Sequence, residues 1–312
     1  MASFRAHLAA WLLRRFVKPR TRRPLDISRM RSREAWLETA PPAGVRVRAA
    51  HVGGVEGEWL EPRDARADLL YLHGGAYVVG SPATHRMLAG AFCSHGFRVF
   101  VPHYRRAPEH PFPAALEDAE SAYRGLLGAG LDPRAPAIAG ESAGGGLALS
   151  LLLRLREAGG PLPPSAALFS PWTDLALSGR SIQANDEAEA LFFKDNLPGI
   201  ARLYLGGAEP RTPLASPLYA DLAGLPPLLI HVGEREILLD DALRLAERAR
   251  DAGVEVTLKR WPVVPHGWQL LQRIVPEAAQ SVAEAAEFLR AAAGRRAPGG
   301  RPAGMPAPET AE

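Results

Sequence analysis

Residues 140–144 read Gly-Glu-Ser-Ala-Gly. The pattern Gly-x-Ser-x-Gly is typical of a nucleophile elbow, in which a serine lies on a sharp turn between a strand and a helix. The short apolar run at residues 135–139 predicts a buried strand, and the apolar run at residues 147–153 predicts a helix. Small residues flank Ser142, as a tight turn without room for side chains requires. The context therefore indicates a nucleophile at Ser142.

A second glycine-rich motif, His-Gly-Gly-Ala, occupies residues 73–76 and follows a predicted buried strand at residues 68–72. Acyl transfer places negative charge on the oxygen of the attacked carbonyl, and backbone N–H groups aimed at that oxygen stabilise it. A glycine loop can supply such donors, together with the N–H of the residue after the nucleophile. We therefore predict an oxyanion hole made by Gly74, Gly75 and Ala143. In isolation, the glycine pair would more often be a simple turn.

A serine hydroxyl is a weak nucleophile and needs a base within hydrogen-bond distance. Of the nine histidines, His266 is the best candidate because it lies in a loop after the predicted last strand, at residues 254–261. In the chain order Ser, Asp or Glu, His, the acid lies between nucleophile and base. A predicted strand at residues 228–232 precedes two candidates. We favour Glu236, which would orient the imidazole, and Glu234 stays open.

These motifs, with Tyr-Arg-Arg-Ala-Pro-Glu at residues 104–109, resemble the hormone-sensitive-lipase family of α/β-hydrolases, the bacterial family IV esterases. The resemblance extends from about residue 67 to residue 289. In that family the acid lies in a Gly-x-x-Asp-Pro-Leu-x-Asp pattern, which here falls on residues 233–240 and selects Glu236. Asp240, at the end of the pattern, is expected to cap the following helix.

Glu236 stands where the family pattern usually has Asp, a change found in other members, and three smaller departures accompany it. Ala76 replaces the third glycine of the oxyanion loop, Glu141 precedes the nucleophile where Asp is common, and Arg106 replaces a usual Leu. The first two are tolerated variants, and the sequence gives no account of Arg106.

The resemblance implies an α/β fold with a mostly parallel central sheet, flanking helices and a helical cap. Alternating apolar strands and helical stretches favour the same class. We assign residues 1–45 to N-terminal cap helices and residues 46–293 to the hydrolase domain. We place a cap insertion at about residues 175–206 and a disordered tail at residues 294–312. Aromatic candidates to line the acyl site are Trp172, Phe192, Phe193 and Tyr204, with core packing as an equal alternative for each.

The first 33 residues carry ten Arg or Lys against one acid, Asp26, so the net charge of +3 comes from this segment. Apolar residues recur there at helical spacing and predict a one-sided apolar helix. We favour a cap helix over a helix lying on a membrane surface. The apolar run is too short for a signal peptide, and Arg14 and Arg15 interrupt it. The stripe consists of Phe4, Leu8, Trp11, Leu12 and Phe16.

Composition narrows the remaining possibilities. The single Cys93 excludes an internal disulfide, and the chain shows no zinc-type spacing, no phosphate-binding loop and no run of about 20 apolar residues. We therefore expect no cofactor, no metal, no nucleic-acid partner and no stable membrane insertion. A cytoplasmic location and a possible homodimer are further expectations.

The resemblance predicts a serine carboxylic ester hydrolase that acts on short- to medium-chain esters through an acyl-enzyme. An amidase, lactonase or deacetylase with the same triad is the alternative, because fold and site type do not fix the substrate. A non-catalytic ligand-binding protein on this fold is disfavoured because His266 is present; plant gibberellin receptors, which resemble the family, have lost that histidine.

Overall fold

The computed structural model of the protein describes residues 2–22, 26–129 and 136–294. A single eight-stranded sheet has the order β1-β2-β4-β3-β5-β6-β7-β8, in which β3 to β8 pair in parallel and β2 pairs antiparallel with β1 and β4. This confirms the predicted mostly parallel sheet. The strands are β1 (Arg46–Val52), β2 (Val55–Glu61), β3 (Ala67–Leu72), β4 (Phe97–Pro102), β5 (Ala137–Glu141), β6 (Ala166–Phe169), β7 (Leu228–Gly233) and β8 (Val256–Trp261).

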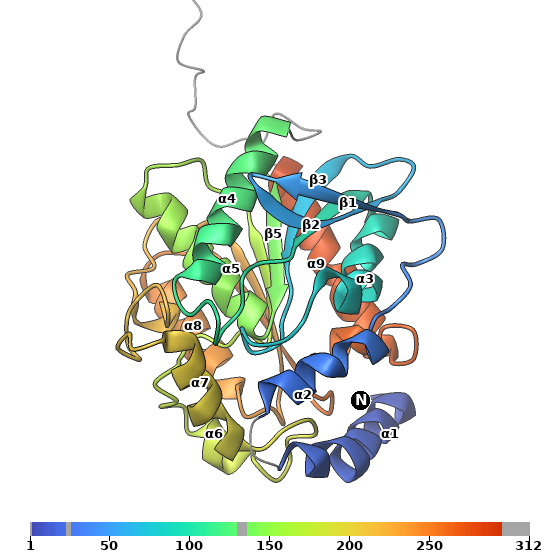
Figure 1. The fold of residues 1–312 in the computed structure, drawn as a ribbon, viewed down its shortest axis with the longest axis vertical. Coiled ribbons are helices and arrows are strands. Elements are labelled where there is room, and N and C mark those ends of the chain that lie inside the picture. The colour runs from blue at the N-terminus through green and yellow to red at the C-terminus, as the bar shows by residue number, and fades with distance from the viewer. Residues whose placement is uncertain (1, 23–25, 130–135, 295–312) are drawn as a thin grey trace, which may run out of the picture.

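Helices cover both faces of the sheet (Figure 1). Because successive side chains of a strand point to opposite faces, Leu70 and Leu72 pack in the larger core cluster, whereas Leu69 and Tyr71 pack in the second. The first cluster includes α4 (Ala114–Ala129), α5 (Ala143–Glu157) and α8 (Leu239–Asp251); the second includes α3 (Pro82–Ala91) and α9 (Pro276–Gly294). The β-strands at the centre are buried on both sides, which explains their continuous apolar runs.

Two further segments lie together at the lower end of the molecule in Figure 1. The Lys18 ammonium, which is buried, donates to the carbonyl oxygen of Glu189 at 3.1 Å, and Asn196 donates to the carbonyl oxygen of Thr21 at 3.0 Å. The N-terminal segment thus contacts the segment between β6 and β7. The first comprises α1 (Phe4–Leu12), η1 (Leu13–Val17), η2 (Lys18–Thr21), α2 (Ile27–Ser32) and η3 (Glu34–Trp36); the second comprises α6 (Ser181–Ala184), η5 (Lys194–Asn196), α7 (Leu197–Leu205) and η6 (Pro217–Tyr219).

Helix α1 buries its small side chains and not its apolar stripe. Ala6 is fully buried in a cluster with Trp261 and Trp268, the latter in η7 (Trp268–Leu271). The bulky stripe residues predicted at helical spacing are exposed, Phe4 to 78% and Trp11 to 49%. Alanine lets the helix approach the two tryptophans closely, so the stripe faces outward. Over the described parts of the chain, none of the helices combines the length and the apolar character needed to cross a bilayer.

Two predictions about where helices begin or end are wrong. Asp240 does not cap α8, because the helix begins at Leu239; its carboxylate accepts the N–H of Ser181, at 3.1 Å, in the insertion between β6 and β7. Gly294, placed in the predicted tail, is the last residue of α9, and residues 295–312 lie outside the described residues.

Arg106, which the sequence alone did not explain, joins the N-terminal segment to the loop after β3. Its guanidinium donates to the carboxylate of Glu34 at 3.1 Å and to the carbonyl oxygen of Gly80 at 2.6 Å. The same carboxylate accepts the N–H of Gly80 at 2.6 Å. Arg106 and Glu34 are both mostly buried. A leucine at position 106 would leave Glu34 without its cation.

We predict that Arg106→Leu lowers the free energy of unfolding by about 1–3 kcal/mol, because charge-assisted hydrogen bonds to partly buried groups are lost. Urea denaturation of full-length protein measures this change. Arg5→Leu is the matched control, since Arg5 is exposed and has no ion-pair partner within the described chain. Equal stability of the two variants would contradict the prediction.

Candidate active site

Ser142 lies on the predicted turn between β5 and α5. Its backbone has φ 55° and ψ −122°, a conformation that L-residues rarely adopt. The turn is held on both sides: the Ser142 N–H donates to the carbonyl oxygen of Phe169 at 2.8 Å, and its own carbonyl accepts the N–H of Trp172 at 2.9 Å. A Cβ atom on Gly144 would lie 2.0 Å from the carbonyl oxygen of Leu72. Only glycine therefore fits there.

His266 lies in the loop after β8 and contacts both other residues of the predicted triad. Its Nε2 lies 2.8 Å from the Ser142 Oγ, and its Nδ1 lies 2.6 Å from Glu236 Oε2. An ionised carboxylate only accepts hydrogen bonds, so Nδ1 carries the proton and Nε2 is left to accept from the serine hydroxyl. The three side chains follow the carboxyl ends of β5, β7 and β8, which meet at one edge of the sheet.

The structure separates the two acids that the residues alone left open. Glu236 is 1% exposed and faces His266, whereas the Glu234 side chain is 41% exposed and lies 3.7 Å from Arg260. The second oxygen of Glu236 accepts the hydroxyl of Ser170 at 2.7 Å and the N–H of Gly233 at 2.6 Å. These donors fix the carboxylate in an orientation that leaves Oε2 for the imidazole.

Sequence reasoning did not identify Ser170 or Glu189. Ser170 directly follows β6 and donates its N–H to His231 of β7, and this position after a strand was the available signal. Glu189 lies in the insertion; its buried carboxylate accepts the N–H groups of Ala190 at 2.8 Å, Leu191 at 2.9 Å and Ile237 at 3.2 Å. Burial and the nearby Glu236 raise the pKa of Glu189, an effect that His266 opposes.

The pKa of His266 is raised above its ordinary value. Burial by itself lowers this pKa, but the charge and hydrogen bond of Glu236 outweigh it, and the charge of Glu189 adds to the increase. The carboxylates thus favour the imidazolium form. A base with a raised pKa accepts a proton from the serine hydroxyl more readily.

The oxyanion loop differs from the expectation at Gly74. The Gly74 N–H donates to the buried carboxylate of Glu141, which also accepts the Tyr71 hydroxyl and lies 2.8 Å from His85 Nε2. Gly74 is therefore not free to hold an oxyanion, because its donor is already used. The N–H groups of Gly75, Ala76 and Ala143 have no acceptor among the described residues. Gly75 and Ala76 have φ of 113° and 52°, so the backbone turns sharply here.

The four aromatic candidates for the acyl site separate into two groups. Phe192 packs edge-on against the His266 ring, with centroids 5.2 Å apart. Phe193 lies instead under two cations of the N-terminal segment, Lys18 and Arg22. Trp172 and Tyr204 belong to the core, both in contact with Tyr77, on which Tyr204 stacks at 3.7 Å. For these two, packing explains the burial.

Helix α1 reaches this site. Ala10 lines a cavity of about 10 Å³ together with Glu189, Glu236 and His266. That volume corresponds to about one water molecule. The N-terminal segment and the insertion therefore close together over the histidine.

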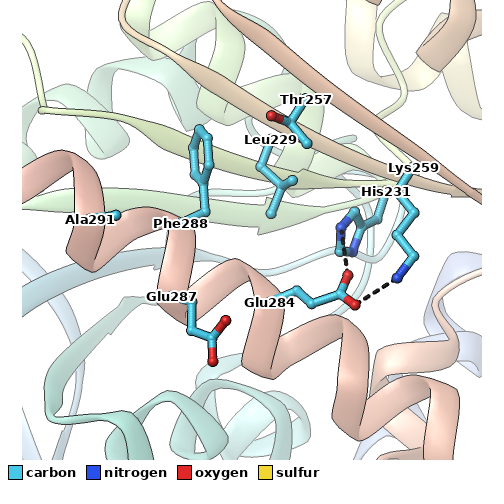
Figure 2. Close-up of a pocket in the computed structure, with 8 residues that line it drawn as sticks. All are labelled: Leu229, His231, Thr257, Lys259, Glu284, Glu287, Phe288 and Ala291. Carbon is cyan, nitrogen blue, oxygen red and sulfur yellow. Dashed lines mark hydrogen bonds and ion pairs between the residues drawn. The ribbon is translucent and has the colours of Figure 1, made fainter.

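A wider groove of about 390 Å³ lies elsewhere, between α9 and the strands β7 and β8 (Figure 2). In Figure 2 the Glu284 carboxylate lies between Lys259, at 2.6 Å, and His231, at 3.7 Å. Burial lowers the pKa of His231 to about 4, which keeps this ring neutral. The groove includes none of the predicted triad, and its charged groups near His231 pair with one another.

Comparison with known proteins gives the family. The sequence model of an α/β-hydrolase-fold family matches residues 69–270. An acetyl-hydrolase of Streptomyces hygroscopicus is 46% identical over 274 residues, 87% of this chain and 90% of that protein. An esterase of Acinetobacter venetianus is 38% identical, over 78% and 82% of the two chains.

Solved structures agree with these relatives. The crystal structure of an esterase from the bacterial hormone-sensitive lipase family is 42% identical and superimposes with a TM-score of 0.87, over 94% of this chain and all of that one. An esterase/lipase from an uncultured bacterium, 37% identical, gives 0.89 over 93% and 99%. The predicted fold and family are confirmed: the chain belongs to the α/β-hydrolases and, within them, to the bacterial hormone-sensitive-lipase-like esterases.

Proposed function

We propose that this protein hydrolyses short- to medium-chain carboxylic esters, with Ser142 as nucleophile, His266 as base and Glu236 as the acid that orients it. The observation that carries the proposal is the continuous hydrogen-bonded chain from the Ser142 hydroxyl through both nitrogens of His266 to Glu236. The name acetyl-hydrolase given to the Streptomyces relative supports a small acyl group.

The reaction begins when the Ser142 oxygen attacks the ester carbonyl and His266 Nε2 takes the hydroxyl proton. Glu236 stabilises the imidazolium that forms. The carbonyl oxygen becomes an oxyanion, which the N–H groups of Gly75, Ala76 and Ala143 would hold. His266 then returns the proton to the departing alcohol as the C–O bond breaks. Water, deprotonated by the same histidine, cleaves the acyl-enzyme and regenerates Ser142.

Glu141 and Phe192 have supporting roles in this proposal. Glu141 fixes the oxyanion loop from behind through the Gly74 N–H, so that the next N–H groups point to the reacting carbonyl. Phe192 limits the space beside His266 and is the aromatic residue that would contact the substrate. The cap boundaries, a cytoplasmic location and a homodimer stay predictions.

We predict that Ser142→Ala and His266→Ala each lower kcat for p-nitrophenyl butyrate by roughly 10⁴-fold or more, because the covalent step loses its nucleophile or base. Glu236→Gln is expected to lose a comparable factor, since an amide can stabilise the wrong tautomer. Steady-state kinetics measure these losses. Glu234→Gln makes the same charge change two residues away and should retain full activity. A large loss of activity in Glu234→Gln, or full activity in Ser142→Ala, would refute the assignment.

We also predict that kcat/KM falls on the acid side at a pH above that expected for an ordinary histidine. His266 must be neutral to accept a proton, and its pKa is raised, so protonation inactivates the enzyme at higher pH. Glu189→Gln removes one of the charges that raise this pKa, so the acid limb should move to lower pH. A pH–rate profile measures the shift.

The control for this profile is Glu187→Gln, an exposed acid of the same insertion. Its acid limb should coincide with that of the wild type. Identical profiles for the two variants, or a shift of the Glu189 variant to higher pH, would contradict the account of the histidine.

A further inference from the structure

Exposed large apolar side chains are confined to two segments of the described chain. Among the described residues, every large hydrophobic side chain that is exposed lies within residues 4–37 or residues 270–274. Trp36, for example, is 89% exposed. Large exposed apolar side chains gathered in one segment point to a site of interaction.

The two segments are neighbours in the fold. Ser3, the N-cap of α1, is bound through its N–H and hydroxyl to the Glu277 carboxylate in the first turn of α9, at 2.5 and 2.8 Å. Residues 270–274 directly precede α9, and Leu271 packs in the same cluster as Ala6. Figure 1 shows α1 beside the segment that leads into α9. The exposed Leu270 and Ile274 thus belong to the segment that packs against the inner side of α1.

Positive charge accompanies the exposed apolar side chains of the N-terminal segment. Arg5, Arg14, Arg15, Arg29 and Arg33 are exposed, and none has a carboxylate partner within the described chain. The only acid among residues 1–33 is Asp26. A helix with an apolar face flanked by arginines has the chemistry that binds an anionic lipid surface. A second copy of this chain is a poorer match, because it would bring the same unpaired cations together.

We propose that residues 4–16, with Leu270 and Ile274, dock on the surface of an anionic phospholipid bilayer. Helix α1 would lie in the plane of the interface, with Phe4, Leu8, Trp11 and Phe16 among the acyl chains and the arginines at the headgroups. Ala10, on the inner side of the same helix, lines the cavity beside His266. Docking would thus bring the side of the molecule that holds Ser142 to the lipid. The inference does not depend on the proposed function.

The test is co-sedimentation of full-length protein with sucrose-loaded vesicles, made of equal parts phosphatidylglycerol and phosphatidylcholine or of phosphatidylcholine alone. Two variants change the face: Trp11→Gln/Phe16→Gln removes apolar groups, and Arg14→Glu/Arg15→Glu reverses charge. The control, Arg63→Glu/Arg66→Glu, makes the same charge change on exposed arginines between β2 and β3, at the other end of the sheet. Thermal unfolding verifies that all variants are folded.

We expect the wild type and the Arg63/Arg66 control to bind the anionic vesicles, more weakly as salt increases. Each variant of α1 should bind the anionic vesicles with an affinity roughly tenfold below that of the wild type, or lower. The reason is that each basic residue near a charged surface and each buried apolar group contributes to the binding free energy.

Three results would overturn the proposal. The first is no binding of the wild type to anionic vesicles. The second is loss of vesicle binding in Arg14→Glu/Arg15→Glu but not in Trp11→Gln/Phe16→Gln. This would mean that the protein adsorbs by charge alone, without insertion of apolar side chains. The third is a wild-type dimer in sedimentation velocity that Trp11→Gln/Phe16→Gln converts to a monomer while vesicle binding is absent, which would assign the face to a second copy.

Discussion

The strained backbone of Ser142 sets the positions of the other groups in the site. A positive φ at a non-glycine residue costs of the order of 1–3 kcal/mol and persists only where the surrounding structure enforces it. Here β6 and the start of the following loop supply that enforcement through hydrogen bonds from both sides of the residue. The turn also requires α5 to begin against β3, so close that a Cβ on Gly144 would overlap the Leu72 carbonyl oxygen. The sheet order β3-β5-β6 and the glycines after the serine are thus parts of one arrangement.

Around this turn, three buried carboxylates act on different parts of the chemistry. Glu236 fixes the tautomer of His266, Glu141 fixes the oxyanion loop, and Glu189 raises the pKa of the histidine from the insertion. Burying a carboxylate is costly unless hydrogen bonds compensate it. Each of the three has several donors, and these include backbone N–H groups: Gly74 for Glu141, Gly233 for Glu236, and three groups for Glu189. The same bonds that compensate burial therefore position the reacting groups.

Much of this could be predicted from residues that are close in sequence. The apolar runs, the turn at Ser142 and the chain order of nucleophile, acid and base are local or ordered patterns, and they led to the fold and to His266. The choice between Glu234 and Glu236 needed the family pattern, since the two differ by only two positions; in the structure one faces solvent and the other His266.

What the sequence could not give depends on contacts between distant segments. Gly74 was assigned wrongly as an oxyanion donor because its partner, Glu141, lies 67 positions away. Ser170 and Glu189 reach the site from a neighbouring strand and from the insertion. Periodicity identified the apolar stripe of α1, but which side of the helix packs inward depends on the close approach of Ala6 to Trp261 and Trp268.

Covalent trapping can establish whether Ser142 is the nucleophile that His266 activates. The protein would be incubated with diethyl p-nitrophenyl phosphate, which transfers its phosphoryl group to an activated serine and releases p-nitrophenol. Intact-mass and peptide mass spectrometry then locate the adduct. We predict one diethylphosphoryl group per chain, on Ser142, and none on the same time scale in His266→Ala. An adduct at another residue, or ester hydrolysis that continues after Ser142 is fully modified, would contradict the account.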